Sequence, residues 1–267
     1  MVQILCMVLL VCLGFYCFHF YPMERRNTKK LVFSALIVVI TLVIKRLTIM
    51  VPIFGAESLK IGFEYIPLMV AGFMLSPSYA FVIGVLVDVM GLVITPTGFP
   101  FFGFTLNEAL IGVIPAVIHH HSLNIDEKRF SKIVIGLIAL LGISGSLFIG
   151  LQTKITISSA VHVITFQEKA ILISLCLLAS LAFIIALLIS TKKVTEENRK
   201  NLMEWILMVI AVEVLITFLL TPIWLNVMYG IPYIASLCVR IIKACFIIPI
   251  EVVIGYSLIK VTKSLKL

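Results

Sequence analysis

Hydrophobic residues along this 267-residue chain fall into long blocks, separated by short polar segments. Most of the blocks are close to the roughly 20 residues that a helix needs to cross a bilayer. The pattern therefore predicts an all-α polytopic membrane protein with about nine transmembrane helices. The apolar runs are residues 3–21, 31–49, 61–75, 79–95, 105–120, 131–151, 169–190, 203–221 and 236–259.

Composition agrees with this prediction and excludes several kinds of protein. Hydrophobic residues make up 61% of the chain and charged residues 13%, whereas soluble domains have about 45–50% and 25%. The net charge is +8, but the basic residues lie between apolar runs, which indicates membrane topology and argues against nucleic-acid binding. The six cysteines lie inside apolar runs without a CxxC pair, so we interpret them as buried thiols and expect no metal, haem, disulfide or other cofactor.

The distribution of basic residues predicts the orientation in the membrane. Lys and Arg cluster in four segments, and the positive-inside rule places such clusters in the cytoplasm. With nine spans, all four fall on that side if the N-terminus is outside and the C-terminus cytoplasmic. The first run is not preceded by basic residues, so we expect it to remain as an anchor helix in the cell membrane. The clusters lie within residues 25–30, 128–132, 192–200 and 260–266.

Four cations lie where this topology does not favour them. Lys45 and Arg46 end the second run at its outer edge, and Arg240 and Lys243 lie in the outer half of the last helix. A charge at the centre of a membrane helix costs about 2.5–3.5 kcal/mol on insertion scales, so it normally faces a partner, a cavity or a ligand. We interpret these cations as recognising an anionic substrate. The alternative is that Lys45 extends to lipid headgroups, which we favour for that residue, and that Arg240 pairs with an acid.

The last helix carries a polar stripe. Arg240 and Lys243 are three residues apart, and Glu251 returns to about the same angle as Arg240 at about 100° per residue. Pro249 removes a backbone donor near the inner end of the stripe and predicts a kink. We expect Arg240 and Lys243 to contact substrate and Glu251 to be their structural counter-ion. Asp88 is expected to be another structural partner, on a ridge of small residues.

The predicted outer loops are rich in aromatic residues. The segment 95–109 has four phenylalanines, two prolines and two glycines, and it leads into Asn107 and Glu108. We expect Phe102 and Phe104 to stack on a flat heterocycle, with the amide and carboxylate recognising its polar edge. The alternative is an interfacial aromatic belt, although belts use Trp and Tyr more than Phe.

Two further aromatic residues flank the predicted site. Trp224 lies in the predicted last outer loop, 221–233, where ligand stacking and membrane anchoring are equally consistent with the sequence. Phe63 enters the helix that follows the first predicted outer loop, whose glycines Gly55 and Gly62 suit a hinged lid.

Four blocks of the chain resemble the substrate-binding S components of energy-coupling factor (ECF) vitamin transporters, most closely the folate-type (FolT) members. The blocks are residues 61–72, 84–112, 221–233 and 240–251. The resemblance implies a six-helix core that captures folate or a related pterin from outside. It also implies docking on a transmembrane coupling subunit with two ATPase subunits. The chain has no Walker A sequence and is not expected to be an enzyme.

Residue chemistry and the resemblance converge on one set of site residues. A pterin suits the aromatic side chains, and the carboxylates of a glutamate tail suit the cations. The predicted substrate-binding residues are Arg46, Phe63, Phe102, Phe104, Asn107, Glu108, Trp224, Arg240 and Lys243, with Asp88 and Glu251 in structural roles.

The chain departs from the six-helix pattern in three respects. Residues 1–22 add a helix, and residues 123–202 insert a helix pair between the core segments 31–122 and 203–267. The first inserted helix has small residues at four-residue intervals, from Gly142 to Gly150, which predict helix packing, and the turn after it alternates like a hairpin. The Ala-x-x-x-Ala docking face of the family is only half present, as Ser34 with Val38 or Ala35 with Val39.

Other functions stay open at this point. The chain is also consistent with an S-component-like binder of another vitamin or with a stand-alone membrane sensor or scaffold. An intramembrane enzyme is disfavoured, because consecutive histidines 119–121 point about 100° apart on a helix. Ser144 likewise has no later intramembrane histidine to activate it.

Overall fold

The computed structural model describes residues 2–24, 27–53, 56–95, 100–122, 127–152, 154–157, 160–163, 165–192 and 196–263. The chain forms two compact units. Unit 1 consists of Met1–Ile49, Ile61–Leu123 and Val253–Leu267, and unit 2 of Met50–Lys60 and Asn124–Val252.

Unit 1 is built around helix α5, which packs against α1, α3 and α4. Its helices are α1 (Val2–Phe20), α2 (Thr28–Arg46), α3 (Tyr65–Met74), α4 (Pro77–Ile94) and α5 (Phe102–Ser122). Gly84 lets helices α4 and α5 approach so closely that a methyl group there would collide with the backbone oxygen of Glu108. A Cβ at Gly112 would lie 3.0 Å from the backbone oxygen of Ala80. The small-residue ridge predicted from Ala80 and Gly84 is therefore a helix-packing surface, as expected.

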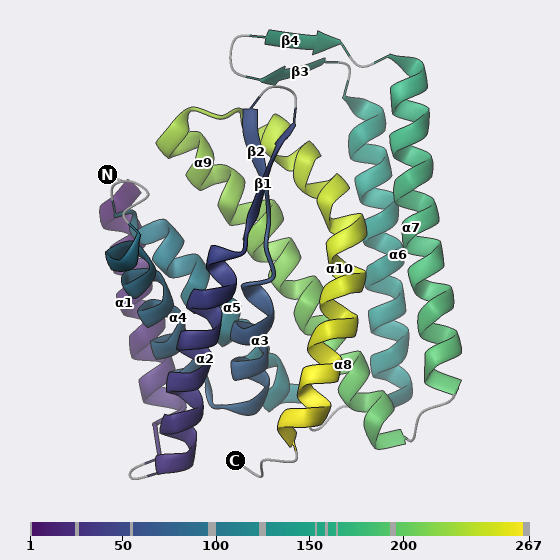
Figure 1. The fold of residues 1–267 in the computed structure, drawn as a ribbon. Coiled ribbons are helices and arrows are strands. Elements are labelled where there is room, and N and C mark those ends of the chain that lie inside the picture. Colours follow the sequence, from purple (N-terminus) through teal and green to yellow (C-terminus); the bar gives the residue numbers. More distant parts are fainter. Residues whose placement is uncertain are drawn as a thin grey trace. The chain divides into compact units, whose positions relative to one another are not determined.

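Unit 2 contains the remaining helices, including most of α10. They are α6 (Glu127–Leu151), α7 (Phe166–Lys192), α8 (Glu196–Val212), the π-helix η1 (Glu213–Leu220), α9 (Thr221–Tyr229) and α10 (Tyr233–Lys263). Helices α6 and α7 run side by side (Figure 1). A Cβ at Gly142 would lie 2.7 Å from the Cβ of Ser180, so the predicted small-residue face of α6 packs against α7.

Two short antiparallel hairpins complete the described fold. Strands β3 (Lys154–Ile157) and β4 (Ala160–Val163) pair with Ile155 opposite His162, which confirms the hairpin predicted between the inserted helices. Strands β1 (Ile49–Ile53) and β2 (Ala56–Ile61) pair where the sequence predicted a loop. Gly55, one of the two hinges expected of that loop, lies outside the described residues.

The predicted helices are present, but two of the predicted loops begin as helix. Residues 221–229 form α9, continuous with η1, with Pro222 in the first turn of α9. Helix α5 starts at Phe102, so the aromatic segment 95–109 is helical over its second half. The prediction that Phe102, Phe104 and Trp224 lie in loops is therefore wrong.

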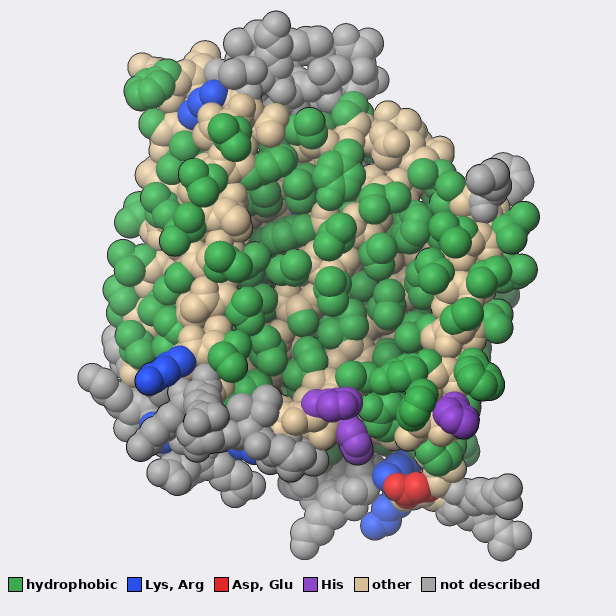
Figure 2. Space-filling model, turned by 180° about the vertical axis from the view of Figure 1, so that it is seen from behind, with side chains coloured by type: hydrophobic (Ala, Val, Ile, Leu, Met, Phe, Trp, Pro, Cys, Tyr) green, Lys and Arg blue, Asp and Glu red, His purple; other side chains and the backbone are tan. Residues whose placement is uncertain are grey.

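Several segments of the chain have the lengths and surfaces of membrane spans. Within the part of the chain that the structure describes, six segments are long and apolar enough to cross a bilayer: Val2–Phe20, Pro77–Ile94, Phe102–Ser122, Phe130–Leu151, Phe166–Leu188 and Asn198–Tyr229. Hydrophobic side chains dominate the surface in Figure 2. Phe15, Val93 and Leu178 are all more than 60% exposed, which in water would be costly and in lipid is not. The protein is an all-α multi-pass membrane protein, as predicted.

Candidate functional site

The first polar cluster lies in unit 1, where the end of α2 meets α5. The ammonium of Lys45 lies 2.6 Å from Oε1 of Glu108, and the two side chains are 24% and 9% exposed. The prediction that Lys45 extends to lipid headgroups is therefore wrong. Glu108 is buried in an apolar helix and takes the nearest cation as its counter-ion, because an unpaired carboxylate there is very costly.

The same carboxylate has an oxygen left over. Oε2 of Glu108 is buried and has no hydrogen-bond partner in the part of the chain that the structure describes. Buried polar atoms nearly always have partners, so an exception needs an explanation. Because the ion pair between Oε1 and Lys45 holds the carboxylate in place, Oε2 is well suited to accept a hydrogen bond from a ligand N–H.

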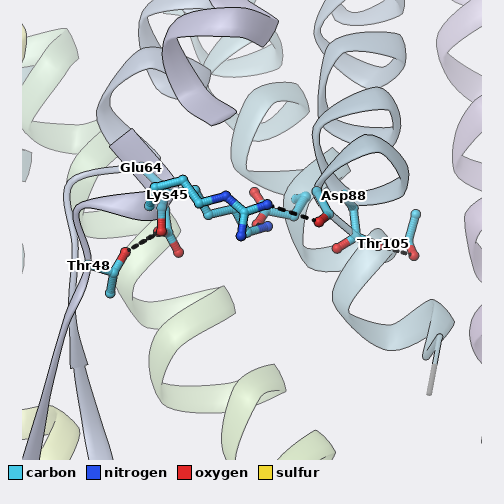
Figure 3. Close-up of polar contacts among 8 residues, drawn as sticks. Lys45, Thr48, Glu64, Asp88 and Thr105 are labelled. Atoms are coloured by element: carbon cyan, nitrogen blue, oxygen red, sulfur yellow. Dashed lines mark hydrogen bonds and ion pairs between the residues drawn. The ribbon is translucent and has the colours of Figure 1, made fainter. Parts of the chain in front are cut away.

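Two further acids surround Lys45. Glu64, just before α3, is buried, and its Oε2 lies 3.1 Å from the hydroxyl of Thr48 (Figure 3). Asp88 of α4 accepts a hydrogen bond of 2.6 Å from the hydroxyl of Thr105 on α5. The carboxylates of Glu64, Asp88 and Glu108 all interact electrostatically with Lys45. Asp88 of α4 and Thr105 of α5 thus join two packed helices.

Arg46 contributes a second cation to this cluster. Its side chain is exposed, and Nη2 lies 3.4 Å from the backbone oxygen of Gly91 on α4. Together, the cluster contains the cations of Lys45 and Arg46 and three carboxylates. We call these five side chains the unit 1 cluster.

The aromatic side chains predicted to form one stacking surface are separated by the early start of α5. Phe102 and Phe104 are two residues apart on this helix, so their side chains leave it about 200° apart. Phe102 is 37% exposed, whereas Phe104 is half-buried and packs edge-on against Phe101 at 5.6 Å. Phe104 lies one turn before Glu108 and on the same face. Of the two rings, only Phe104 is positioned beside the unit 1 cluster.

The second polar cluster lies in unit 2, between η1 and α10. Glu213 and Glu251 are each only 1% exposed. Lys243 attracts both carboxylates, and Arg240 attracts Glu213. Arg240 also donates a hydrogen bond of 3.2 Å from Nε to the hydroxyl of Ser236. We call Glu213, Arg240, Lys243 and Glu251 the unit 2 cluster.

Glu213 was missed by the sequence analysis, although a signal for it exists. It is an acid inside the apolar run 203–221, and the cost of an intramembrane charge that marked Arg240 applies equally to it. Glu251 was expected to be the counter-ion of the two α10 cations. In the structure Glu213 is a second counter-ion, so these cations interact with two buried acids.

Trp224 is buried in unit 2. Its side chain on α9 is 5% exposed, whereas a belt residue places its ring at the surface. The structure thus argues against membrane anchoring, which the sequence left open.

An apolar cavity of about 330 Å³ lies elsewhere in unit 2. It is lined by α6, α7, η1 and a second face of α10, with Leu237, Ile241 and Ile248 on that face. The thiols of Cys176 and Cys245 lie 3.6 Å apart in its wall. No charged side chain of the described residues lines this cavity, so it does not suit an anionic substrate.

The predicted site residues are distributed over both units. Phe63, at the start of α3, is half-buried, and Asn107 is buried beside Glu108 on α5. Unit 1 holds Arg46, Phe63, Asp88, Phe102, Phe104, Asn107 and Glu108. Unit 2 holds Trp224, Arg240, Lys243 and Glu251.

The histidines considered for an enzyme point to different partners. The ring of His119 lies 4.4 Å from that of Phe73, and the ring of His120 lies 5.0 Å from that of Tyr21. His121 contacts the backbone oxygen of Val117. Their divergence follows from the helical spacing used in the sequence analysis.

Comparisons with known proteins match this architecture to a transporter family. Residues 29–152 match the family described as "ECF transporter, substrate-specific component". The "Folate transporter FolT" of Clostridium novyi (strain NT) is 31% identical over 117 residues, which are 43% of this chain and 64% of the relative. The chain therefore matches somewhat less than two thirds of the length of this relative.

A solved structure supports the fold over a longer stretch. The crystal structure of FolT bound with folic acid matches with a TM-score of 0.50 and 21% identity, and the match covers 87% of this chain and 93% of that one. The predicted resemblance to the substrate-binding S components is confirmed over residues 29–152, and the solved structure supports the fold. The family match contains the unit 1 cluster and ends at the last residues of α6.

Proposed function

We propose that this chain, which over residues 29–152 matches the substrate-specific component of ECF transporters, captures folate or a related pterin from outside the cell membrane. Partner subunits then drive its uptake with ATP. The observation that carries the proposal is the unit 1 cluster. It contains a buried carboxylate that pairs with Lys45 and has one oxygen without a hydrogen-bond partner among the described residues, within the stretch that matches a folate transporter.

Each part of a folate has a matching group in the chain. The pterin has a flat ring for Phe63 and Phe104, and its N–H donors suit Oε2 of Glu108 and the amide of Asn107. The carboxylates of a glutamate tail suit Arg46, Arg240 and Lys243, since charge-assisted hydrogen bonds are about twice as strong as neutral ones. Asp88 and Glu251 keep their structural roles. In this proposal Phe102 makes a smaller contribution than predicted, because it projects from the opposite side of α5.

The proposed partners are an ECF transmembrane coupling subunit and two ATPase subunits. Helix α2 exposes Ala35 and Val39, and Val39 is 57% exposed, so this half of the predicted docking face is free on the surface of unit 1. With the N-terminus outside and the C-terminus in the cytoplasm, the basic clusters face the ATPases. In this arrangement the chain binds substrate and performs no chemistry on it.

A related vitamin is the second candidate, and the charges of the unit 1 cluster favour it. Three carboxylates face two cations there, so this part of the site suits a ligand that is rich in N–H donors or carries a positive charge. A membrane sensor that binds the ligand without transporting it is a third candidate function.

A titration of the purified protein in detergent tests the proposal. The chain has two tryptophans, Trp205 and Trp224, both of them buried, so a bound pterin is expected to quench their fluorescence. Folate, riboflavin and thiamin are titrated in parallel, with heat measured by calorimetry. Saturable quenching by folate supports the assignment, and saturation by another vitamin supports the second candidate. If none of them binds at micromolar concentration, substrate capture is wrong. Co-purification of the coupling subunit and ATPases separates a transporter from a sensor.

A further inference from the structure

The apolar cavity of unit 2 is lined by none of the predicted substrate-binding residues. It has a volume of about 330 Å³ and lies among α6, α7, η1 and α10, and most of its lining side chains are half-buried. Leu219 of η1, in the cavity wall, is 47% exposed, so the cavity is open to the surroundings of the protein. Helices α6 and α7 and the segment that contains η1 are long and apolar enough to cross a bilayer. The surroundings of the cavity are therefore the hydrocarbon of the membrane.

The hydroxyl and thiol donors in the lining are already engaged. The hydroxyls of Ser144 and Ser180 donate to backbone oxygens of their own helices, at 3.2 and 2.9 Å. The hydroxyl of Tyr233 donates to the backbone oxygen of Phe218, and the thiol of Cys245 donates within α10. A polar ligand would lose its hydrogen bonds to water here, and a water molecule in a cavity needs two to four polar partners. The lining therefore suits an apolar ligand.

The cavity is elongated along the helices. One row of lining residues on α10 recurs at intervals of three or four and shares one face of the helix. The row consists of Tyr233, Leu237, Ile241, Ala244 and Ile248. At 1.5 Å per residue it is about 22 Å long, and the lining of α6 from Ile138 to Phe148 is about 15 Å long. One leaflet contributes half of the hydrocarbon core, about 15 Å, so the cavity has the length of one acyl chain.

The helices around the cavity touch at some points and leave space at others. A Cβ at Gly145 of α6 would lie 3.3 Å from the side chain of Ile241 on α10, and the thiols of Cys176 on α7 and Cys245 on α10 lie 3.6 Å apart. Protein interiors normally pack with few voids larger than a water molecule. An unfilled void of this size forfeits the dispersion contacts of its lining. The bilayer supplies acyl chains that restore those contacts.

The lining also distinguishes between two sources of an acyl chain. No charged side chain of the described residues lines the cavity, so the carboxylate of a free fatty acid would find no counter-ion there. A phospholipid needs none, because its headgroup stays at the membrane interface while one chain enters. We propose that this cavity binds one acyl chain of a bilayer phospholipid, which completes the packing of α6 and α7 against α10. The proposal does not depend on which vitamin the chain binds.

Photocrosslinking of the full-length protein in phosphatidylcholine nanodiscs is the test. The nanodiscs contain a trace of phosphatidylcholine with a diazirine in one acyl chain, and the labelled residues are mapped after irradiation. We expect more label on the half-buried lining residues Leu141 and Ile241 than on Leu178 and Leu181 of α7, which are 64% and 54% exposed. A chain that only brushes the surface labels exposed residues more. Equal or lower labelling of the lining overturns the proposal.

A filled cavity provides the second arm of the test. Ala179 lines the cavity from α7, so Ala179→Phe places a ring in it, and the label on Leu141 and Ile241 should be lost. Ala182→Phe is the matched control, because Ala182 is exposed on the same helix and does not line the cavity. It should leave the label unchanged. Where Ala179→Phe does not fold, Ala244→Phe fills the cavity from α10. Label that persists on the lining of a folded, filled variant overturns the proposal.

Native mass spectrometry identifies the source of the chain. The protein is released from the same nanodiscs after palmitate has been added to them. We expect one phosphatidylcholine to stay bound to the unchanged protein and to the control variant, and to be lost from the filled variant. Retention of palmitate in its place overturns the phospholipid as the source. Retention of no lipid, or of equal lipid by the filled variant, overturns the site.

Discussion

The two polar clusters differ in how their buried carboxylates are neutralised. In the unit 1 cluster, the buried acid Glu108 has a cation at 2.6 Å, and only one of its oxygens is unpartnered. In the unit 2 cluster, one oxygen of Glu251 has no hydrogen-bond partner among the described residues, and Lys243 attracts the carboxylates of both Glu213 and Glu251. The first cluster is therefore a formed ion pair that also stabilises the helix packing. The second is an incompletely satisfied arrangement, suited to exchange partners when a ligand binds.

The largest expected effect, on stability, comes from breaking the ion pair between Lys45 and Glu108. Lys45→Met leaves Glu108 buried without its cation, and removing one partner of a buried pair costs about 3–5 kcal/mol. We expect a clear fall in the midpoint of thermal unfolding in detergent. Lys45→Met combined with Glu108→Gln should recover much of the loss.

The control for this prediction is Lys30→Met. Lys30 pairs with the exposed Glu24 near the start of α2, where solvent screens the interaction. This variant should change the unfolding midpoint little. Equal losses for Lys30→Met and Lys45→Met would show that Lys45 is not a buried counter-ion.

The next effect tests the cations of unit 2. Arg240→Ala and Lys243→Ala each remove a charge-assisted hydrogen bond to the ligand, worth about 1.5–3 kcal/mol, so the Kd for folate should weaken at least about tenfold. Lys260→Ala is the control, because Lys260 lies over the ring of Tyr256 near the end of α10. If Arg240→Ala lowers stability while the Kd stays the same, Arg240 is structural.

The aromatic residues of α5 give a smaller and more selective effect. Phe104→Leu should weaken folate binding by about 0.5–1.5 kcal/mol, which is the value of an aromatic pair beyond its buried area. Phe102→Leu changes the same type of residue two positions away and should have little effect. Titration by fluorescence quenching compares the two, and a larger effect for Phe102 would contradict the site described above.

The smallest effect concerns packing in unit 2. Cys176 on α7 and Cys245 on α10 have their sulfur atoms 3.6 Å apart, so mild oxidation should join them with little change in the fold. Intact-mass measurement and peptide mapping should find this cross-link, whereas Cys12 of α1, which is exposed, should remain available to a lipid-soluble thiol reagent. Cross-linking of Cys238 instead would contradict the packing of α10 against α7.

Much of the fold follows from the sequence because membrane helices are specified locally. Apolar length fixes where each helix lies, and the predicted run 131–151 became Glu127–Leu151. Helix ends were less predictable. Residues 221–229 contain Pro, Trp and Tyr, and the sequence predicted a loop there, yet they form α9 directly after η1.

The sequence predicted which residue types form the candidate site better than it predicted which side chains pair with one another. The cost of intramembrane charge singled out Arg240, Lys243 and Asp88 without any structure. The same rule was not applied to Glu213, and it gave no way to see that Lys45 turns towards Glu108. Glu213 and Lys243 are 30 positions apart in the chain, and Lys45 and Glu108 are 63 apart, so only the packing of helices brings each pair together.

The sequence by itself determined the class of this protein, its helices and the residues that carry charge into the membrane, because hydropathy and the cost of burying charge act on each segment separately. The tertiary structure decided which of those charges face one another and which oxygens are left without partners. It did so because ion pairs and hydrogen bonds depend on distances of a few ångströms between side chains of different helices. In unit 1 such a distance shows a formed ion pair between Lys45 and Glu108.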